Sequence, residues 1–367
     1  MAKLCLLANA ASTHTEKWAI ALSERGWEID ILSFLPAEFP HVKVHVIPRL
    51  AGGKADAILR QAWVRKKIKE IRPDLIHAHY ATSFGLLGAL ARRHPLVISA
   101  WGSDIFSFPR ISFLHQSLLK WILGHADVLC SSSNIMAQEM HRYIGTEQAV
   151  EIIPFGVDMT RFSPSQGENG PGECAYPKSG GLEAPVVFGV AKGLHQVYGL
   201  DLLIKAFALV HDRFPQTLLR IAGDGPERNT LEDLSKKLCV NEYVEWLGRL
   251  PNTNVADFYR SVDVVVVPSR EESFGVTAVE GSACARPVIA SRVGGLTEVI
   301  VEGETGFLFP SENISELGKV MERLIENPTL RDTMGQRGRS HVLKHYDWQK
   351  NVTQMELVYE RVLHSHN

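Results

Sequence analysis

The stretch VDVVVVPSREESFGVTAVEGSACARPVIA, residues 262–290, reads as a strand, a loop, a helix and a second strand. The apolar run 264–267 predicts a strand buried on both faces, and Pro268 ends it. Apolar residues then recur at helical spacing, at Val276, Val279 and Ala283. We expect this helix to begin near Phe274, with Ser273 as its N-cap. Strand, helix and strand in this order predict a parallel sheet covered by helices.

The same alternation of short apolar runs and amphipathic stretches extends along both halves of the chain. Apolar runs occur at 3–8, 28–34, 74–80, 95–102, 127–132, 186–193, 217–222, 243–250, 262–269 and 286–295. The predicted fold is α/β, with two doubly wound domains in tandem facing across a cleft, and ligands are expected at the carboxyl ends of the strands. The expected division is a first domain at 1–163, a Gly- and Pro-rich linker at 164–185, a second domain at 186–345 and a final helix at 346–367. This helix packs on a domain surface, and packing back on the first domain is one option.

Composition places the chain among globular proteins and excludes a fibre or a disordered chain: of 367 residues, 45% are hydrophobic and 22% charged. Residues 1–153 carry 17 Lys and Arg against 13 Asp and Glu, and residues 154–367 carry 22 against 28. This asymmetry fits a first half that meets something anionic, or ordinary surface scatter. No nucleic-acid-binding motif is present, and no apolar segment reaches the roughly 20 residues of a membrane span.

The five cysteines are far apart and in no metal-binding spacing, which predicts a reducing compartment and no zinc site. The start of the chain mimics a signal peptide, but its apolar run from Leu4 to Ala8 is too short for one. We therefore expect a first buried strand there.

Glu272 precedes the predicted helix of the opening stretch, and Glu280 lies within it. The first amides of a helix, here Phe274, Gly275, Val276 and Thr277, have no intrahelical acceptor, so together with the helix dipole they form an anion site. The two acids would then accept hydrogen bonds from hydroxyls on either side of a bound phosphate. A simpler interpretation is that Glu272 caps the helix dipole and Glu280 pairs with an arginine.

Five segments in register resemble the retaining glycosyltransferases of family four, which have the GT-B fold of two Rossmann-like domains. They are 152–158 (IIPFGVD), 222–228 (AGDGPER), 272–300 with its two glutamates, 303–309 (GETGFLF) and 345–351 (HYDWQKN). The resemblance covers nearly the whole chain and is strongest over 150–365.

The resemblance implies roles for the residues of the second domain. Glu280 would hold the donor ribose and Glu272 a hydroxyl of the transferred sugar. The amides of Phe274, Gly275, Val276 and Thr277 would contact the sugar and the diphosphate. The backbone near Gly248 and Leu250 would face the base, and Gly223 would lie in a turn at the same rim, where the alternative is simply a tight turn.

The departing nucleoside diphosphate needs a fixed positive charge or a metal. No Asp-x-Asp occurs in the chain, which favours a metal-free reaction. The family's usual Arg and Lys positions fall at Lys192, or one residue on at Gly193, and at Tyr198. We expect Lys192 to carry the charge. Protonated His195 would compensate for the cation that is missing at Tyr198, unless His195 is an ordinary surface residue.

In the first domain, Asn9, Ser12 and His14 follow the first strand and are expected to face the acceptor. Trp101 stands where many relatives have a histidine near the reacting sugar, so it either stacks on an acceptor sugar or packs in the core. Asp104 either binds an acceptor hydroxyl or caps the next helix.

Three further features leave alternatives open. His77 and His79 share a strand face, but no third metal ligand is visible. The basic helix that contains Arg60, Arg65, Lys66, Lys67 and Lys69 would meet anionic lipid or polysaccharide, or simply face water. The stretch 110–123 would touch a membrane or pack in the core.

The sequence thus predicts a retaining, metal-independent hexosyltransferase that uses a UDP- or GDP-linked sugar, requires no cofactor and acts on a hydroxyl of a glycan, a lipid-linked sugar or a small molecule. It is expected in the cytoplasm, with peripheral contact to the inner face of the membrane, and its oligomeric state is left open. The alternatives are a sugar-nucleotide 2-epimerase of related fold and an inactive nucleotide- or glycan-binding subunit. A dinucleotide oxidoreductase would need a Gly-x-Gly-x-x-Gly motif after the first strand of a domain, and no such motif follows the first strand of either domain.

Overall fold

A computed structural model describes residues 2–50, 56–164 and 185–366, and these form two compact units. Unit 1 contains the residues up to Pro154 and those from Gln349 onward, and unit 2 contains Phe155–Trp348. The division falls before the expected end of the first domain at residue 163, because 155–163 belong with unit 2. Most of the expected linker, residues 165–184, lies outside the described residues.

Unit 1 has a seven-stranded parallel sheet of order β3-β2-β1-β4-β5-β6-β7 in its described part. The strands are β1 (Lys3–Leu7), β2 (Glu28–Ser33), β3 (Val42–Val46), β4 (Leu75–His79), β5 (Leu96–Ser99), β6 (Val128–Ser131) and β7 (Val150–Ile152). The predicted first strand at Leu4–Ala8 is confirmed as the buried β1.

Helices cover both faces of the sheet in unit 1. They are α1 (Thr13–Glu24), α2 (Asp56–Leu59), α3 (Gln61–Ile71), α4 (Phe84–Ala91), α5 (Ser103–Phe106), α6 (Phe113–Leu123), α7 (Asn134–Ile144) and α15 (Trp348–His366), with a 3₁₀ turn η2 (Phe108–Arg110). Alternate residues of β1 face opposite sides, and Cys5 and Leu7 join the core under α3, α4 and α6.

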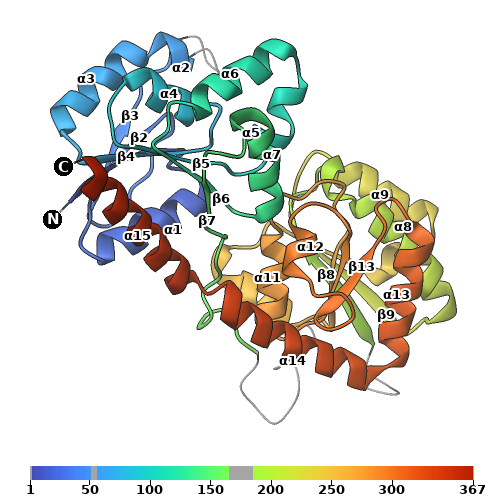
Figure 1. Cartoon of the computed structure of the whole chain (residues 1–367). Coiled ribbons are helices and arrows are strands. Elements are labelled where there is room, and N and C mark those ends of the chain that lie inside the picture. The colour runs from blue at the N-terminus through green and yellow to red at the C-terminus, as the bar shows by residue number, and fades with distance from the viewer. Residues whose placement is uncertain (1, 51–55, 165–184, 367) are drawn as a thin grey trace. The chain divides into compact units, whose positions relative to one another are not determined.

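The C-terminal helix α15 packs in unit 1, next to α1 (Figure 1). Arg25, at the end of α1, donates to Thr353 Oγ1 at 2.8 Å and to Glu356 Oε2 at 2.5 Å. Tyr359 OH lies 2.6 Å from Nδ1 of His77 in β4, and Tyr359 is fully buried. The polar contacts therefore tie the helix to both an edge and the interior of this unit.

Unit 2 has a six-stranded parallel sheet of order β10-β9-β8-β11-β12-β13 in its described part. The strands are β8 (Val186–Ala191), β9 (Thr217–Ala222), β10 (Val244–Gly248), β11 (Val264–Val267), β12 (Val288–Ser291) and β13 (Gly306–Phe309). Both sheets place the first strand of the unit in the interior and cross over after it, which is the Rossmann order.

The helices of unit 2 also cover both faces of its sheet (Figure 1). One face carries α8 (Leu200–Arg213), α9 (Arg228–Lys237) and α13 (Ile314–Glu326). The other carries α10 (Val255–Arg260), α11 (Val276–Ala283), α12 (Leu296–Val299) and α14 (Pro328–His345). Three 3₁₀ turns complete the unit: η3 (Gln196–Tyr198), η4 (Asn241–Tyr243) and η5 (Asn252–Asn254).

The helix of the opening stretch begins later than predicted. Its first residue is Val276, and its N-cap is Gly275 rather than Ser273. Gly275 has φ +108°, and a Cβ on it would lie 2.7 Å from Leu296 Cδ2, so a glycine suits this position on both counts. The loop from Pro268 to Phe274 is therefore longer than helical periodicity suggested.

Candidate functional site

The loops after β8, β9 and β10 meet at the carboxyl edge of the unit 2 sheet and line a cavity of about 210 Å³. Its lining residues come from these loops, from α10 and from α11: Ala191, Lys192, Ala222, Gly223, Arg249, Leu250, Asn252, Val255 and Glu280. This is the edge at which doubly wound sheets bind ligands. Four of the sequence-predicted residues, Lys192, Gly223, Leu250 and Glu280, thus lie around one cavity.

Two glycines explain how the loop after β8 lies against the turn after β9. Gly223 has φ +147°, and a Cβ on it would lie 1.8 Å from the carbonyl oxygen of Lys192. A Cβ on Gly225 would lie 2.5 Å from the carbonyl oxygen of Leu194. In return, the amides of Lys192 and Leu194 donate to the carbonyls of Ala222 and Asp224. The Gly-Asp-Gly turn therefore positions the backbone of Lys192.

The side chain of Lys192 forms an ion pair with Glu272: Nζ lies 2.7 Å from Oε2. The two side chains are only 15% and 10% exposed, respectively, so this pair is shielded from bulk water. Ser269 Oγ also donates to Glu272 Oε2, at 3.3 Å. The Glu272 carbonyl accepts a hydrogen bond from the amide of Gly295 at 3.0 Å, which anchors the backbone of the glutamate.

Tyr198 contacts Lys192 through its ring. Lys192 Nζ lies 4.4 Å from the centroid of this ring, within the range of a cation–π interaction. The aromatic face of Tyr198 therefore helps to hold the Lys192 ammonium group in place. His195 is exposed, and its ring stands edge-on to Tyr198 at 6.2 Å between centroids.

The start of α11 presents backbone amides without protein acceptors. In the described part of the chain, no backbone or side-chain oxygen accepts from the amides of Phe274, Gly275, Val276 or Thr277. Their side chains serve the fold: the Phe274 ring is buried against Phe155 and Tyr346, and Thr277 Oγ1 donates to the Ala191 carbonyl at 3.2 Å. These amides, rather than the side chains, are the groups available to an anion.

Glu280 is oriented by a residue that the sequence did not point to. Tyr259 OH, on α10, donates to Glu280 Oε2 at 3.1 Å. Tyr259 is fully buried, and burial, reinforced by the Glu280 carboxylate, raises its pKa well above the ordinary value. It therefore remains a protonated donor to Glu280 at any working pH.

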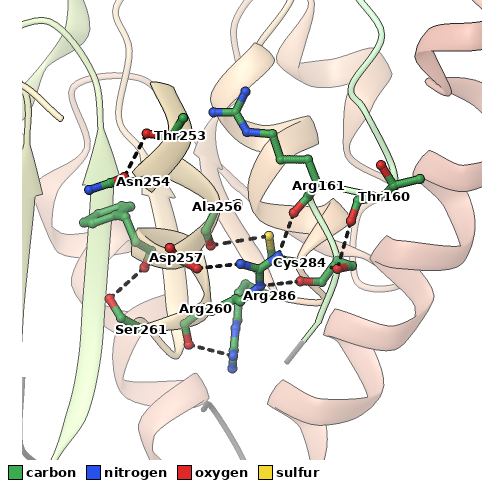
Figure 2. A network of polar contacts seen from close by, with 12 residues as sticks. Thr160, Arg161, Thr253, Asn254, Ala256, Asp257, Arg260, Ser261, Cys284 and Arg286 are labelled. Carbon is green, nitrogen blue, oxygen red and sulfur yellow. Dashed lines mark hydrogen bonds and ion pairs between the residues drawn. The ribbon is translucent and has the colours of Figure 1, made fainter. Parts of the chain in front are cut away.

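A network of arginine contacts fixes α10 (Figure 2). This is the helix that carries Tyr259. Arg260 donates to the carbonyl oxygens of Arg161 at 2.6 Å and Ser163 at 2.9 Å, and Arg286 donates to the Arg260 carbonyl at 2.8 Å. Figure 2 shows the Arg260 side chain reaching from α10 to the segment that holds Arg161. The segment 155–163 is thus bound to the helix that carries Tyr259.

In unit 1, the predicted acceptor residues lie at the carboxyl edge of the sheet. Asn9 is exposed, and Ser12 is the N-cap of α1. His14 and Trp101 are ring neighbours, with centroids 5.6 Å apart, and the Trp101 ring also lies 4.9 Å from that of His79. Trp101 is half-buried, so part of its surface is accessible.

Asp104 stabilises the fold of unit 1 through hydrogen bonds to backbone amides. Its carboxylate accepts hydrogen bonds from the amides of Ala81 at 2.7 Å and Gly102 at 2.7 Å, and the residue is fully buried. Burial raises its pKa, and these amides oppose the shift. Gly102, not Asp104, is the N-cap of α5. The carboxylate therefore joins two loops at the sheet edge.

His77 and His79 both point into unit 1 and are both 1% exposed. His77 is bonded through both ring nitrogens, to Tyr359 OH and, at 2.8 Å, to Ser99 Oγ. Burial lowers the pKa of His79 to about 3, and its Nδ1 has no hydrogen-bond partner in the part of the chain described. Within that part, no group of three or more His, Cys, Asp or Glu side chains is arranged to hold a metal.

Sequence reasoning missed Tyr259, Arg249, Asn252 and Ser269. Arg249 adjoins the predicted Leu250 and is an exposed cation at the cavity, so its charge was a usable signal. Tyr259 sits in an apolar helical run and gives no sequence signal. Its contact with Glu280 arises from the packing of α10 on α11.

Two family models match the chain: "Glycosyl transferase 4-like" over residues 3–133 and "Glycosyl transferases group 1" over residues 176–341. An uncharacterized glycosyltransferase of Methanocaldococcus jannaschii is 31% identical over 336 residues, which cover 90% of this chain and 88% of the relative. The D-inositol 3-phosphate glycosyltransferase of Kribbella flavida is 31% identical over 291 residues, covering 73% and 66%.

Solved structures share the fold at low sequence identity. The sucrose-phosphate synthase from Thermosynechococcus elongatus superimposes with a TM-score of 0.86 at 22% identity over 100% of both chains. Anabaena HepE in complex with UDP and glucose gives a TM-score of 0.81 at 21% identity over 98% of this chain and 100% of HepE. Both Rossmann-like units, the matching models and the related sequences lead to one conclusion: the chain belongs to glycosyltransferase family four and is a transferase of GT-B fold.

Proposed function

We propose that this glycosyltransferase moves a hexose, with retention of configuration, from a UDP- or GDP-linked sugar to a hydroxyl acceptor without a metal ion. The observation that carries the proposal is the grouping of Lys192, Glu272 and Glu280 around the start of α11 in unit 2. Solved structures of the same fold hold UDP and UDP-glucose, which supports a nucleotide-sugar donor.

The diphosphate would lie at the start of α11. The amides from Phe274 to Thr277 and the positive end of the helix dipole favour an anion there. Lys192 adds a cation at the same edge, and Arg249 offers a second one at the cavity. These groups would stabilise the negative charge that develops on the leaving nucleoside diphosphate, which is the charge the reaction must accommodate. The lack of an Asp-x-Asp motif supports a reaction without a metal.

Glu280 would accept a hydrogen bond from the donor ribose, with its carboxylate oriented by Tyr259. Glu272 would accept one from a hydroxyl of the sugar. Because Glu272 is paired with Lys192, one contact positions both the carboxylate and the cation. The bond from the anomeric carbon to the phosphate oxygen breaks, the bond to the acceptor oxygen forms on the same face, and the acceptor proton passes to the departing phosphate oxygen.

Asn9, Ser12, His14 and Trp101 are the proposed acceptor contacts, at the carboxyl edge of the unit 1 sheet. Several relatives are named for small hydroxyl-bearing acceptors, D-inositol 3-phosphate and L-malate. These names support an acceptor hydroxyl on a small molecule. The half-buried ring of Trp101 offers an apolar face on which a sugar acceptor would stack.

We also propose a cytoplasmic location with peripheral membrane contact through α6. In the described residues, no helix has the length and apolar character of a membrane span. Ile111, Phe113 and Leu114 are 62%, 77% and 76% exposed, and Arg110 and Lys120 are exposed in the same segment. Exposed apolar side chains next to cations suit the interface of an anionic bilayer. Flotation with phosphatidylglycerol vesicles should recover the protein, and Phe113→Ser/Leu114→Ser should remove it from the floating fraction.

The proposed donor is tested by thermal unfolding in the presence of UDP, GDP, ADP and their sugars. A donor that binds only the folded chain raises the melting temperature. At a hundredfold excess of donor over Kd, the free energy of unfolding rises by about 2.7 kcal/mol. The anomeric configuration of the product is then read by NMR. An inverted product would reject retention, and a melting temperature that no nucleotide shifts would reject the nucleotide-sugar donor.

A further inference from the structure

A second cavity, of about 450 Å³, lies in unit 1 and has no part in the proposed transfer reaction. It is lined by the ends of α3 and α4: Arg65, Ile68, Lys69, Arg72, Ala91, Arg92 and Arg93. These helices end just before β4 and β5 begin, so the cavity lies at the amino edge of the sheet. Asn9, Ser12 and His14 follow the end of β1 and lie at the opposite, carboxyl edge.

Five of the seven lining residues are Arg or Lys, and none of these five forms an ion pair with a carboxylate in the described part of the chain. Lys67, on the same helix but outside the cavity, pairs with Glu70 at 2.5 Å. The chain as a whole has a net charge of −2. Five gathered cations repel one another, and an anion would relieve this repulsion.

Part of this cation cluster is held in place by the backbone. Arg65 Nε and Nη2 donate to the Leu90 carbonyl at 2.8 and 2.5 Å. Arg93 Nη2 lies 3.5 Å from the carbonyl oxygen of Pro73. These contacts fix two guanidinium groups while leaving their charge uncompensated, so a ligand would meet preorganised donors.

Arg72 and Arg92 occupy left-handed backbone conformations, with φ 53° and 52°, at the ends of α3 and α4. Glycine is the usual residue at such positions, because a Cβ is disfavoured there. A cation at the C-terminal end of a helix also interacts favourably with the helix dipole. In α3, however, Lys69 already supplies such a cation in the last turn. Both helix ends thus bring an arginine to the lining of the same cavity.

We propose that this cavity binds a ligand with more than one phosphate group, through Lys69, Arg72, Arg92 and Arg93 with Arg65 behind them. Arginine forks match the paired oxygens of phosphate, and the volume lies within the roughly 300–1,000 Å³ of small-molecule sites. The phosphate groups would belong either to a free phosphorylated compound or to a phospholipid headgroup.

The test compares wild-type protein with Arg72→Gly/Arg92→Gly. Glycine relieves the left-handed backbone at both positions, so the variant should melt at or above the wild-type temperature in the absence of ligand. Inorganic pyrophosphate, titrated calorimetrically at low salt, should bind the wild type and bind the variant about tenfold more weakly or worse, as expected for losing one charge-assisted contact or more. Lys66→Ala/Arg337→Ala removes two exposed cations outside the cavity and should bind pyrophosphate as the wild type does.

Two further measurements assign the site and the source of the phosphate. Lys192→Ala alters the proposed donor site, so binding that this variant keeps and Arg72→Gly/Arg92→Gly loses belongs to the unit 1 cavity. If the phosphates belong to a lipid headgroup, Arg72→Gly/Arg92→Gly should also cosediment less than the wild type with vesicles that contain cardiolipin, a lipid with two phosphate groups. If only pyrophosphate binding falls and vesicle binding is unchanged, the ligand is a free phosphorylated compound. Equal binding of pyrophosphate and of vesicles by the wild type and this variant would overturn the proposal.

Discussion

Lys192 Nζ lies 2.7 Å from Glu272 Oε2, and this ion pair connects the loop after β8 with the loop before α11. Eighty positions separate the two residues in sequence. The ring of Tyr198 also contacts the ammonium group, with its centroid 4.4 Å from Nζ. A carboxylate and an aromatic ring therefore both contact the lysine, which also lines the cavity.

Lys192→Ala should lower kcat by about 10²-fold or more, the loss seen when one donor to a developing negative charge is removed. Lys192→Arg should keep a larger share of the activity, because the charge remains. Steady-state kinetics with the donor found by thermal unfolding measures both. Lys205→Ala, which breaks the surface pair with Asp201, is the matched control and should leave kcat unchanged. Unchanged turnover in Lys192→Ala would exclude the proposed role of this lysine.

Glu280→Ala should weaken nucleotide binding, whereas Glu272→Ala should mainly lower turnover. Tyr259→Phe keeps the Glu280 carboxylate but removes its hydrogen bond of 3.1 Å, so Kd for the nucleotide should rise by up to about tenfold. Calorimetric titration gives the affinities, and kinetics at saturating donor gives kcat. Equal losses of affinity in Glu280→Ala and Glu272→Ala would contradict the separate roles of Glu280 in nucleotide binding and of Glu272 in turnover.

Gly223→Ala should lower the free energy of unfolding by about 1–3 kcal/mol, because its φ of +147° disfavours a side chain and its Cβ would lie 1.8 Å from the Lys192 carbonyl. Donor affinity should fall as well, since the displaced carbonyl belongs to Lys192. Denaturant unfolding and nucleotide titration measure the two effects. Gly318→Ala is the control: this glycine lies within α13, where a Cβ would meet only Val210 Cγ2 at 3.8 Å, and stability should hold or rise.

His79 predicts a pH dependence of stability. Its folded pKa is about 3 against an ordinary 6.5, so below pH 6.5 the unfolded chain takes up a proton that the folded chain refuses. The free energy of unfolding should therefore fall as the pH drops from 6.5 towards 3, by about 1.4 kcal/mol per pH unit from this residue. His79→Phe should remove that share of the slope and leave no orphaned Nδ1.

Denaturant unfolding at several pH values checks this prediction, with the exposed His364→Gln as the control that should keep the wild-type slope. His77 contributes in the same direction, because burial lowers its pKa well below the ordinary value. Identical slopes in wild type and His79→Phe would mean that His79 is protonated in the folded chain.

The part of the candidate site around α11 could be predicted along the chain, because its elements are consecutive. The run Val264–Val267, the loop after it and the helix with Glu280 are consecutive, and the carboxyl end of a parallel strand is where such a loop carries function. The start of α11 was placed too early, because helical periodicity marks the buried face and not the first helical residue. That residue is decided by Gly275, whose φ of +108° and lack of a Cβ beside Leu296 leave no trace in the periodicity.

The sequence by itself determined the α/β class, the two Rossmann-like units and the residues around the start of α11, since buried parallel strands and glycine-dependent turns leave patterns within a few residues. Only the tertiary structure decided that Lys192 pairs with Glu272, that Tyr259 orients Glu280 and that Asp104 is enclosed by backbone amides. Such contacts join side chains far apart in sequence. Their partners are chosen by the packing of helices on a sheet, which no local pattern records.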